Sequence, residues 1–179
     1  MSHRPSWDEY FLSLAKLAAT RSTCRAVAVG AVIVKDRQVL ATGYNGPPAG
    51  FAHCTELGHC YVGVPRCDSD QAFTSRAAHA EMNAIAMAAR KGIAVEGATM
   101  YTTLEPCLSC TKLILAAGLV QVFYEVGLSY DRARAAFVEE LAIPILPLQL
   151  SPAATQRAVD LIQSPTSYKL PPDPVGYAG

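Results

Sequence analysis

The sequence predicts an α/β protein of three layers, α/β/α, in which helices flank a mixed sheet of about five strands. Two observations carry this prediction. Apolar segments of strand length alternate with amphipathic segments of helix length, and a short polar turn separates the first two strands. A turn that short makes these two strands antiparallel, so the sheet is mixed. The 179 residues fit one domain, and 51% hydrophobic residues supply enough apolar material for its core.

The first part of the chain predicts a helix followed by a hairpin. Ser6 and Glu9 have the S-x-x-E spacing of a capping box, so a helix begins near Ser6. We expect its apolar face to consist of Trp7, Tyr10, Phe11, Leu14 and Ala18. The β-branched run at residues 27–34 predicts a buried strand, and residues 39–45 predict the returning strand after the turn KDRQ.

Residues 46–76 have no periodic pattern and are rich in glycine and proline. A loop of this length within a compact domain is unusual and is typically functional or tied to another part of the chain.

The second half of the chain continues the alternation of helices and strands. Periodicity and helix-stop glycines predict helices at 79–92 and 106–118 and near 130–142 and 151–163, with strands at 98–103, 119–125 and 143–148. In the helix at 79–92 we expect Met82, Ile85, Ala86 and Ala89 to form the stripe that packs on the sheet. Residues 1–163 would form the domain, and the proline-rich residues 164–179 would be a tail without packing of its own.

Charge and hydropathy argue against two classes of partner. The 15 basic and 15 acidic residues cancel, and no basic excess of the kind typical of nucleic-acid binders is visible. No run of 18 apolar residues predicts a membrane helix, and the N-terminal segment MSHRPSWDEY lacks the apolar core of a signal peptide. We therefore expect a cytoplasmic protein that binds neither nucleic acid nor membrane.

The sequence contains the two halves of a metal site. His79-Ala80-Glu81 matches H-x-E, and Pro106 to Cys110 matches P-C-x-x-C; this combination is the signature of zinc-dependent deaminases. His79, Cys107 and Cys110 make three zinc ligands with a fourth position open to water, and Glu81 would carry protons between water and substrate. The alternatives, a histidine satisfied in the core and a redox-active cysteine pair, leave Glu81 and the spacing unexplained. No organic cofactor is required.

Longer motifs make the chain resemble the deoxycytidylate (dCMP) deaminases of the cytidine deaminase superfamily. These motifs are SWDEYF, RSTC, VGAVIVKD, ATGYNGPPAGFAHC, HAEMNAI, EGATMYTTLEPCLSC and AAGL, spread over roughly residues 5 to 147. The resemblance implies the cytidine-deaminase-like fold, conversion of dCMP to dUMP with release of ammonia for dTMP synthesis, and a homo-oligomer, either a hexamer or a dimer.

The resemblance also implies contacts with nucleotides. Asn45 corresponds to a residue that contacts the sugar. Gly43, Tyr44, Asn45 and Gly46 correspond to a site at which dCTP activates and dTTP inhibits some relatives; the alternative is a turn that ends a strand. Tyr130 resembles a residue that contacts the phosphate. Arg25 and Arg76 are further candidates for the phosphate, although such arginines are often only solvated.

The remaining cysteines suggest a second, structural zinc site. Cys24, Cys54, Cys60 and Cys67 could supply four thiolates and so tie the long loop to the first helix, with His53 or His59 replacing one of them. The alternative is a set of reduced cysteines without a metal.

Other functions remain open at the level of sequence. A tRNA adenosine deaminase shares both halves of the metal motif, but the neutral charge and the cysteine-bearing loop argue against it. A deaminase of free nucleosides or of the riboflavin pathway is another alternative. A non-catalytic zinc scaffold belongs to a different class and has no need of Glu81.

Overall fold

The computed structural model describes residues 4–60, 75–128, 132–140 and 143–163. The predicted tail at 164–179 lies outside the described residues, as do Cys67 and Tyr130. The elements, in chain order, are α1 (Trp7–Ala19), β1 (Gly30–Lys35), β2 (Gln38–Tyr44), α2 (Cys54–Leu57), α3 (Ala80–Arg90), β3 (Thr99–Leu104), α4 (Leu108–Ala116), β4 (Gln121–Val126), α5 (Arg132–Glu139), β5 (Ile145–Pro147) and α6 (Pro152–Gln163).

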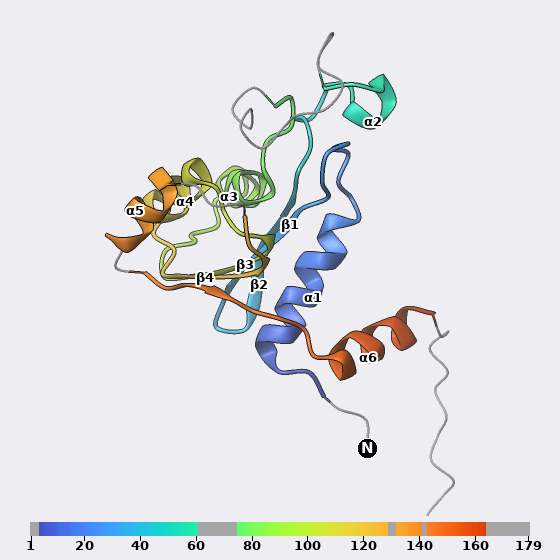
Figure 1. Cartoon of the computed structure of the whole chain (residues 1–179), viewed down its shortest axis with the longest axis vertical. Coiled ribbons are helices and arrows are strands. Elements are labelled where there is room, and N and C mark those ends of the chain that lie inside the picture. Colours follow the sequence, from blue (N-terminus) through green and yellow to red (C-terminus); the bar gives the residue numbers. More distant parts are fainter. Residues whose placement is uncertain (1–3, 61–74, 129–131, 141–142, 164–179) are drawn as a thin grey trace, which may run out of the picture.

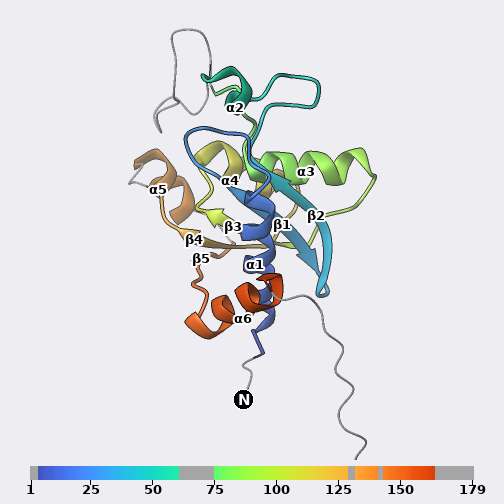
Figure 2. The same ribbon diagram turned by 90° about the vertical axis from the view of Figure 1, so that its right-hand side faces the viewer.

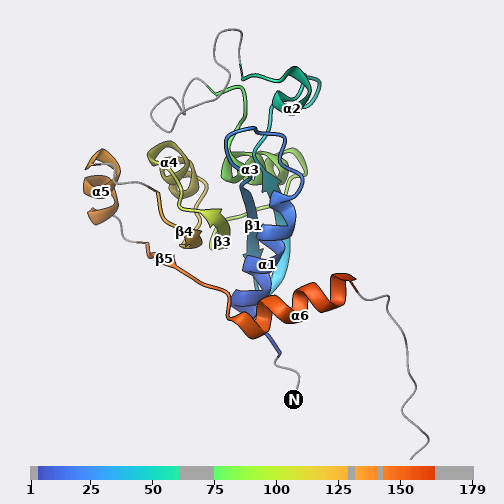
Figure 3. The same ribbon diagram turned by 45° about the vertical axis from the view of Figure 1, so that its right-hand side comes forward.

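The five strands form one mixed sheet with the order β2-β1-β3-β4-β5. Strand β1 runs antiparallel to both β2 and β3, whereas β3, β4 and β5 are parallel to one another. Helices α1 and α6 lie on one side of the sheet, and α3 and α4 lie on the other, with α5 beside α4 (Figures 1 and 3). The predicted three-layer α/β/α fold with a mixed, five-stranded sheet is confirmed.

The central strand β1 is buried on both faces. Ala31 and Ile33 pack with the residues of α3 and α4, and Val32 and Val34 pack with the residues of α1. Asp36 and Arg37 connect it to β2 with φ angles of 50° and 62°, the backbone of a tight hairpin turn with a right-handed twist.

The predicted start of this strand at Val27 was wrong, because the ladder begins at Gly30. Residues 27–29 bond to Asn45 instead of to a neighbouring strand. The Nδ2 of Asn45 donates to the carbonyl of Val27 (2.8 Å), and the N–H of Val29 donates to the Oδ1 of Asn45 (2.8 Å).

The capping box of α1 is confirmed, but its predicted buried face is only partly right. The buried residues are Phe11, Leu12 and Ala15, whereas Trp7 and Tyr10 are 43% and 45% exposed. The helix approaches β1 so closely that a Cβ on Gly30 would overlap the carbonyl oxygen of Ala15. The small residue Ala15 therefore lies at the point of closest approach, and Phe11 and Leu12 are buried on the same helix.

The predicted stripe of α3 was only partly right: Met82 and Ile85 are half-buried, and Ile85 packs against the core. Ala80, Ala84 and Ala88 face the sheet, and Ala86 and Ala89 are exposed. A Cβ on Gly43 of β2 would overlap backbone atoms of Ala80 and Ala84, so the strand and the helix touch through backbone. This close contact fixes the first turn of α3 against the end of β2.

The predicted long loop contains a short helix, α2, which ends at Gly58 with a φ of 77°. Helix α2 lies beyond the sheet, at the end of the molecule near the start of α3 (Figure 2). The remaining predicted helices and strands are present, with boundaries shifted by a few residues. Among the described residues, none of the helices combines the length and the hydropathy needed to cross a bilayer.

Candidate metal centre

His79 occupies the position immediately before α3, where its extended backbone (φ −71°, ψ 157°) begins the helix. An isolated bridge holds it there, since Ala78 and Gly46 exchange two backbone hydrogen bonds of 3.0 and 3.1 Å. The side chain of Asn83 adds a 2.8 Å hydrogen bond to the carbonyl of Tyr44. The end of β2 and the start of α3 are thus joined at the residue that carries the imidazole.

Cys107 occupies the same position at the start of α4, with an extended backbone (φ −67°, ψ 169°). The buried side chain of Thr111 donates to the carbonyl of Cys107 (3.0 Å), and the N–H of Thr111 donates to it as well (2.8 Å). Cys110 follows in the first turn of α4 and is fully buried. Two helix starts, where backbone N–H groups favour thiolates, therefore meet over the same edge of the sheet.

The structure brings the three predicted metal ligands together. The Nδ1 of His79 lies 3.5 Å from the Sγ of Cys107 and 3.4 Å from the Sγ of Cys110. All three donor atoms lie within 4.8 Å of one another. Tetrahedral zinc with typical bond lengths separates its nitrogen and sulfur ligands by about 3.5 Å, so these side chains fit a zinc ion without rearrangement.

The surroundings of Cys107 favour its thiolate, whereas the contact with Cys107 and burial raise the pKa of Cys110. The pKa of Cys107 falls to about 4, chiefly because the Cys110 side chain hydrogen-bonds to the thiolate and secondly because His79 does so. The same contact with Cys107 raises the pKa of His79, since it favours the imidazolium. The Cys107 thiolate and the protonated ring of His79 therefore stabilise each other, and zinc binding would displace the proton of the imidazolium.

Glu81 is 4% exposed and lies in the first turn of α3. Burial is the main reason that its pKa is raised, and the charges of His79 and Cys107 also act on it. A buried carboxyl beside a cluster of metal ligands, with its pKa shifted toward neutrality, suits a group that takes up and releases protons.

Asn45, the predicted sugar contact, is buried and already has several backbone and side-chain partners. Its Oδ1 accepts from the hydroxyl of Ser22 (2.6 Å) in addition to Val29, while its Nδ2 donates to Val27. Asn45 therefore fixes the segment before β1 against the end of β2. Its neighbour Gly43 has a packing role against α3, and Gly46 pairs with Ala78.

The two predicted phosphate-binding arginines lie in different surroundings. Arg25 is exposed and near Gly58. The Nε of Arg76 donates to the carbonyl of Cys60 (2.9 Å), so this side chain braces the cysteine-bearing segment.

Three of the four cysteines predicted for a second zinc site are described. Cys54 and Cys60 are buried, and the pKa of the Cys54 thiol is raised by burial and by the nearby Cys60 and Cys24. Backbone N–H groups point at two of the sulfurs: Ala26 donates to Cys24 (3.4 Å), and Arg76 donates to Cys60 (3.3 Å). Among the described residues, the compact group of possible metal ligands is formed by His79, Cys107 and Cys110 and does not include Cys24, Cys54 or Cys60.

The two candidate replacement histidines differ in their contacts. His53 pairs with Glu56, whose Oε1 lies 3.3 Å from the Nδ1 of His53. The Nδ1 of His59, by contrast, is buried and makes no hydrogen bond within the described part of the chain.

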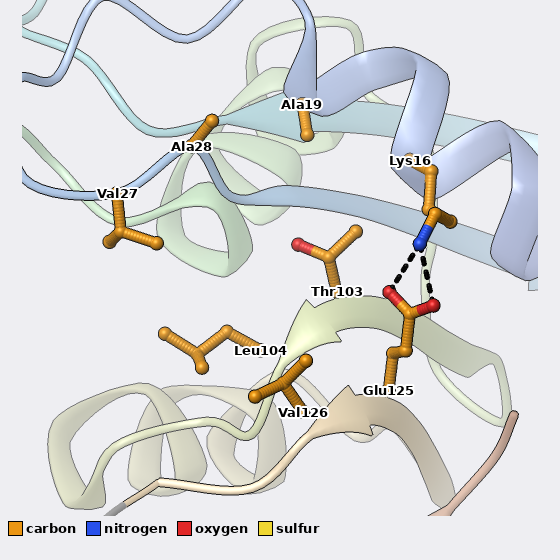
Figure 4. Close-up of a pocket in the computed structure, with 8 residues that line it drawn as sticks. All are labelled: Lys16, Ala19, Val27, Ala28, Thr103, Leu104, Glu125 and Val126. Atoms are coloured by element: carbon orange, nitrogen blue, oxygen red, sulfur yellow. Dashed lines mark hydrogen bonds and ion pairs between the residues drawn. The ribbon is translucent and has the colours of Figure 1, made fainter.

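A pocket of about 260 Å³ opens on the α1 side of the sheet, at the ends of β3 and β4 (Figure 4). Its lining residues are Lys16, Ala19, Val27, Ala28, Thr103, Leu104, Glu125 and Val126. The ammonium of Lys16 faces the carboxylate of Glu125 at 2.5 and 2.7 Å. None of the metal-centre side chains lines this pocket, so we place the chemistry at the triad and not here.

Sequence reasoning missed one side chain close to the metal centre. Glu105 precedes Pro106, and its Oε2 accepts a 2.9 Å hydrogen bond from the N–H of Leu128. The available signal was an acidic residue between a strand and a metal-binding turn, but sequence alone does not reveal its partner.

Comparisons with known proteins agree with this geometry. A family model described as "Cytidine and deoxycytidylate deaminase zinc-binding region" matches residues 5–126. The deoxycytidylate deaminase of Mycobacterium phage D29 is 48% identical over 124 residues, covering 68% of this chain and 95% of the phage protein. The deoxycytidylate deaminase of Saccharomyces cerevisiae is 42% identical over 72% of this chain, which spans 40% of the yeast protein. The crystal structure of dCMP deaminase from cyanophage S-TIM5 in complex with dCMP and dUMP has a TM-score of 0.66 and 26% identity, covering 82% of this chain and 99% of that one.

Proposed function

The chain belongs to the family of cytidine and deoxycytidylate deaminases with a zinc-binding region, and we propose that it hydrolyses dCMP to dUMP and ammonia. The observation that carries this proposal is the convergence of His79, Cys107 and Cys110 beside the buried Glu81. Deoxycytidylate deaminases among its relatives, from a phage and from yeast, support dCMP as the substrate. The product dUMP would supply dTMP synthesis.

We assign the zinc ion to His79, Cys107 and Cys110, which leaves a fourth position for water. When bound, zinc supplies a hydroxide nucleophile at neutral pH by lowering the pKa of that water to about 7. The donor set supports this assignment, because two thiolates and one imidazole are ligands that zinc prefers. The backbone contacts at the starts of α3 and α4 would hold the ligands in place in the absence of substrate.

In this proposal Glu81 moves the protons. Its carboxylate accepts a proton from the attacking water, delivers it to the ring nitrogen next to the amino-bearing carbon, and assists the departure of the amine as ammonia. The carbon–nitrogen bond to the amino group breaks and a carbonyl forms, so dCMP and water give dUMP and ammonia. The burial that raises the pKa of Glu81 supports both directions of transfer.

A substrate panel tests the proposed function. Ammonia release is measured from dCMP, CMP, dCTP, deoxycytidine and a tRNA anticodon stem, each with and without dCTP or dTTP as effector. We expect dCMP to give the highest kcat/KM of the panel. Release from the adenosine of the tRNA stem alone would assign the chain to the competing tRNA deaminases.

We further propose a second, structural zinc at the cysteine cluster, with Cys24, Cys54, Cys60 and Cys67 as its ligands. Two observations support this site. Cys60 and Cys24 are near enough to Cys54 to raise the pKa of its thiol, and backbone N–H groups donate to the sulfurs of Cys24 and Cys60. His59 is the better candidate to replace one thiol, because its buried Nδ1 has no described partner, whereas His53 pairs with Glu56.

Metal analysis of the purified protein tests this second site. We expect two zinc ions per chain and one in the Cys24→Ser variant, which should also unfold at a lower temperature. Cys107→Ser is the matched control, since it removes a ligand of the other cluster. One zinc per wild-type chain, together with a Cys24→Ser variant of unchanged stability, would remove the structural site.

Assembly, regulation and the remaining nucleotide contacts also remain proposals. We propose a homo-oligomer, a hexamer or a dimer, in the cytoplasm, with dCTP and dTTP acting at Gly43 to Gly46. Asn45 is proposed to contact the sugar; its fixed position between the start of β1 and the end of β2 supports this role. Tyr130, Arg25 and Arg76 remain the candidates for the phosphate.

A further inference from the structure

Glu105 joins the metal-binding turn to the segment that follows β4. Its side chain accepts from the N–H of Leu128 (2.9 Å), and its own N–H donates to the carbonyl of Val126 (2.8 Å). The carboxylate also lies near Gly127, since a Cβ built there would be 3.6 Å from its Oε2. Glu105 thus bonds to Val126 and Leu128 and lies beside Gly127, the residue between them.

This joint lies where the topology places ligands. Strands β3 and β4 are parallel, and Leu104 pairs with Val126 at their carboxyl ends. In open α/β sheets, ligands bind beyond the carboxyl ends of parallel strands. The segment after β3 leads within three residues to Cys107, so the segment after β4 lies next to the metal centre and is available to hold the part of the substrate that does not react.

The hydrogen bonds of Glu105 favour a role in holding the segment after β4 over a role in holding the metal ligands. Its described partners are backbone groups of residues 126–128, whereas the ligands His79, Cys107 and Cys110 are held by contacts at the starts of α3 and α4. Removing the carboxylate would therefore free the N–H of Leu128 at the exit of β4, whereas the hydrogen bonds described at the starts of α3 and α4 are made by other residues. A half-buried charge that accepts from an N–H also makes a stronger bond than a neutral acceptor.

We propose that Glu105 is a positioning residue, which fixes Gly127 and Leu128 beside the metal centre so that this segment can bind the substrate. The inference rests on the proposed deaminase function. It deepens that function by assigning substrate affinity, and not the chemical step, to a side chain two residues before a metal ligand.

Steady-state kinetics with dCMP test the proposal in three variants. Glu105→Ala is expected to raise KM about tenfold, the order of effect of losing one charge-assisted hydrogen bond, while kcat and zinc content change less than about threefold. Glu105→Gln keeps an oxygen acceptor and should restore most of the affinity. Glu96→Ala is the matched control, because Glu96 is an exposed glutamate that precedes the start of β3. This substitution should leave KM and kcat unchanged.

Amide hydrogen exchange at Leu128 provides a readout that does not depend on activity. We expect faster exchange of this N–H in Glu105→Ala but not in Glu105→Gln. An unchanged KM in Glu105→Ala, or a loss of kcat in parallel with loss of zinc, would overturn the positioning role. A wild-type protein inactive on dCMP in which Leu128 is still protected by Glu105 would instead overturn the proposed function and leave the contact intact.

Discussion

Glu81 combines two properties that a surface glutamate does not have: it is 4% exposed, and its neighbours are the ligands of the candidate metal centre. The sequence predicted this residue because H-x-E and P-C-x-x-C occurred together and in order. His79 and Glu81 are two residues apart on a helix start, and the structure explains the spacing. His79 lies before the first turn with its ring toward the cysteines, while Glu81 is inside the turn and faces the buried side.

Replacing Glu81 by glutamine distinguishes zinc binding from proton transfer, because it changes only the proposed proton carrier. We expect Glu81→Gln to keep its zinc, because no ligand is changed. Its kcat should fall by about 10²- to 10⁴-fold, the range for general acid–base groups. Zinc analysis and ammonia release on the same sample measure both quantities. A variant with near-native turnover would refute the assigned role.

Other residues near the site could not be assigned from sequence because their roles depend on partners distant in the chain. Asn45 bonds to residues 16 to 23 positions away, and Glu105 bonds to Leu128, 23 positions away. A Gly/Asn motif predicts a turn equally well with or without these bonds. Long-range hydrogen bonds to the backbone leave no local pattern that a single sequence could reveal.

Helices α1 and α6 are joined at their N-termini by a single carboxylate. The Oε2 of Glu9 accepts from the N–H of Ser6 (2.8 Å), and its Oε1 accepts from the N–H (3.1 Å) and hydroxyl (2.5 Å) of Ser151. The hydroxyl of Ser151 in turn accepts from the N–H of Ala154 in the first turn of α6 (3.2 Å). The capping box was predictable from Ser6 and Glu9, whereas its link to Ser151 was not.

This joint predicts a stability that depends on pH. The hydroxyl of Ser151 and the N–H of Ser6 lower the pKa of Glu9 from 4.5 to about 2. Because the pKa of Glu9 is lower in the folded state, its carboxylate stabilises the fold above about pH 4.5. This stabilisation is lost as the pH falls toward 2. Because Glu9 is near the surface, we expect Glu9→Gln to lower the free energy of unfolding by only about 1 kcal/mol at neutral pH.

Urea unfolding of wild type and Glu9→Gln at neutral pH and near pH 2 measures this difference. The difference between the two proteins should be mostly lost near pH 2, where Glu9 is almost fully protonated in the unfolded state and about half protonated in the folded state. Glu140→Gln, at an exposed position after α5, serves as the control and should not change with pH relative to wild type. If the two free energies of unfolding differed by the same amount at both pH values, the ionised carboxylate of Glu9 would not be what joins the helices.

Helix faces were the least predictable feature at the scale of elements. Apolar periodicity predicted buried faces that included Trp7 and Tyr10 of α1 and Met82 and Ile85 of α3. At the closest crossings, however, alanines face the sheet. Gly30 and Gly43 allow these approaches, and their partners on the helices must be small. Periodicity records which residues are apolar but not how near two backbones come.

At the scale of the molecule, the alternation of helices and strands predicted the three layers, and the hairpin predicted a mixed sheet. The strand order β2-β1-β3-β4-β5 was not derivable, because it depends on which strand pairs with β1 after a connection that includes α3. That pairing brings the starts of α3 and α4 over one edge. The metal centre is therefore a consequence of topology, even though its ligands were visible in the sequence.

The fold, the metal centre and the relatives together lead to the proposal that this protein deaminates dCMP. The decisive measurement quantifies dUMP and ammonia together, with zinc-loaded wild-type protein and dCMP as the sole substrate. We predict that the two products form in equal amounts and that Glu81→Gln forms neither at a comparable rate. Zinc-loaded protein that left dCMP unchanged would refute the proposed activity, and equal ammonia release with and without Glu81 would refute the role of Glu81.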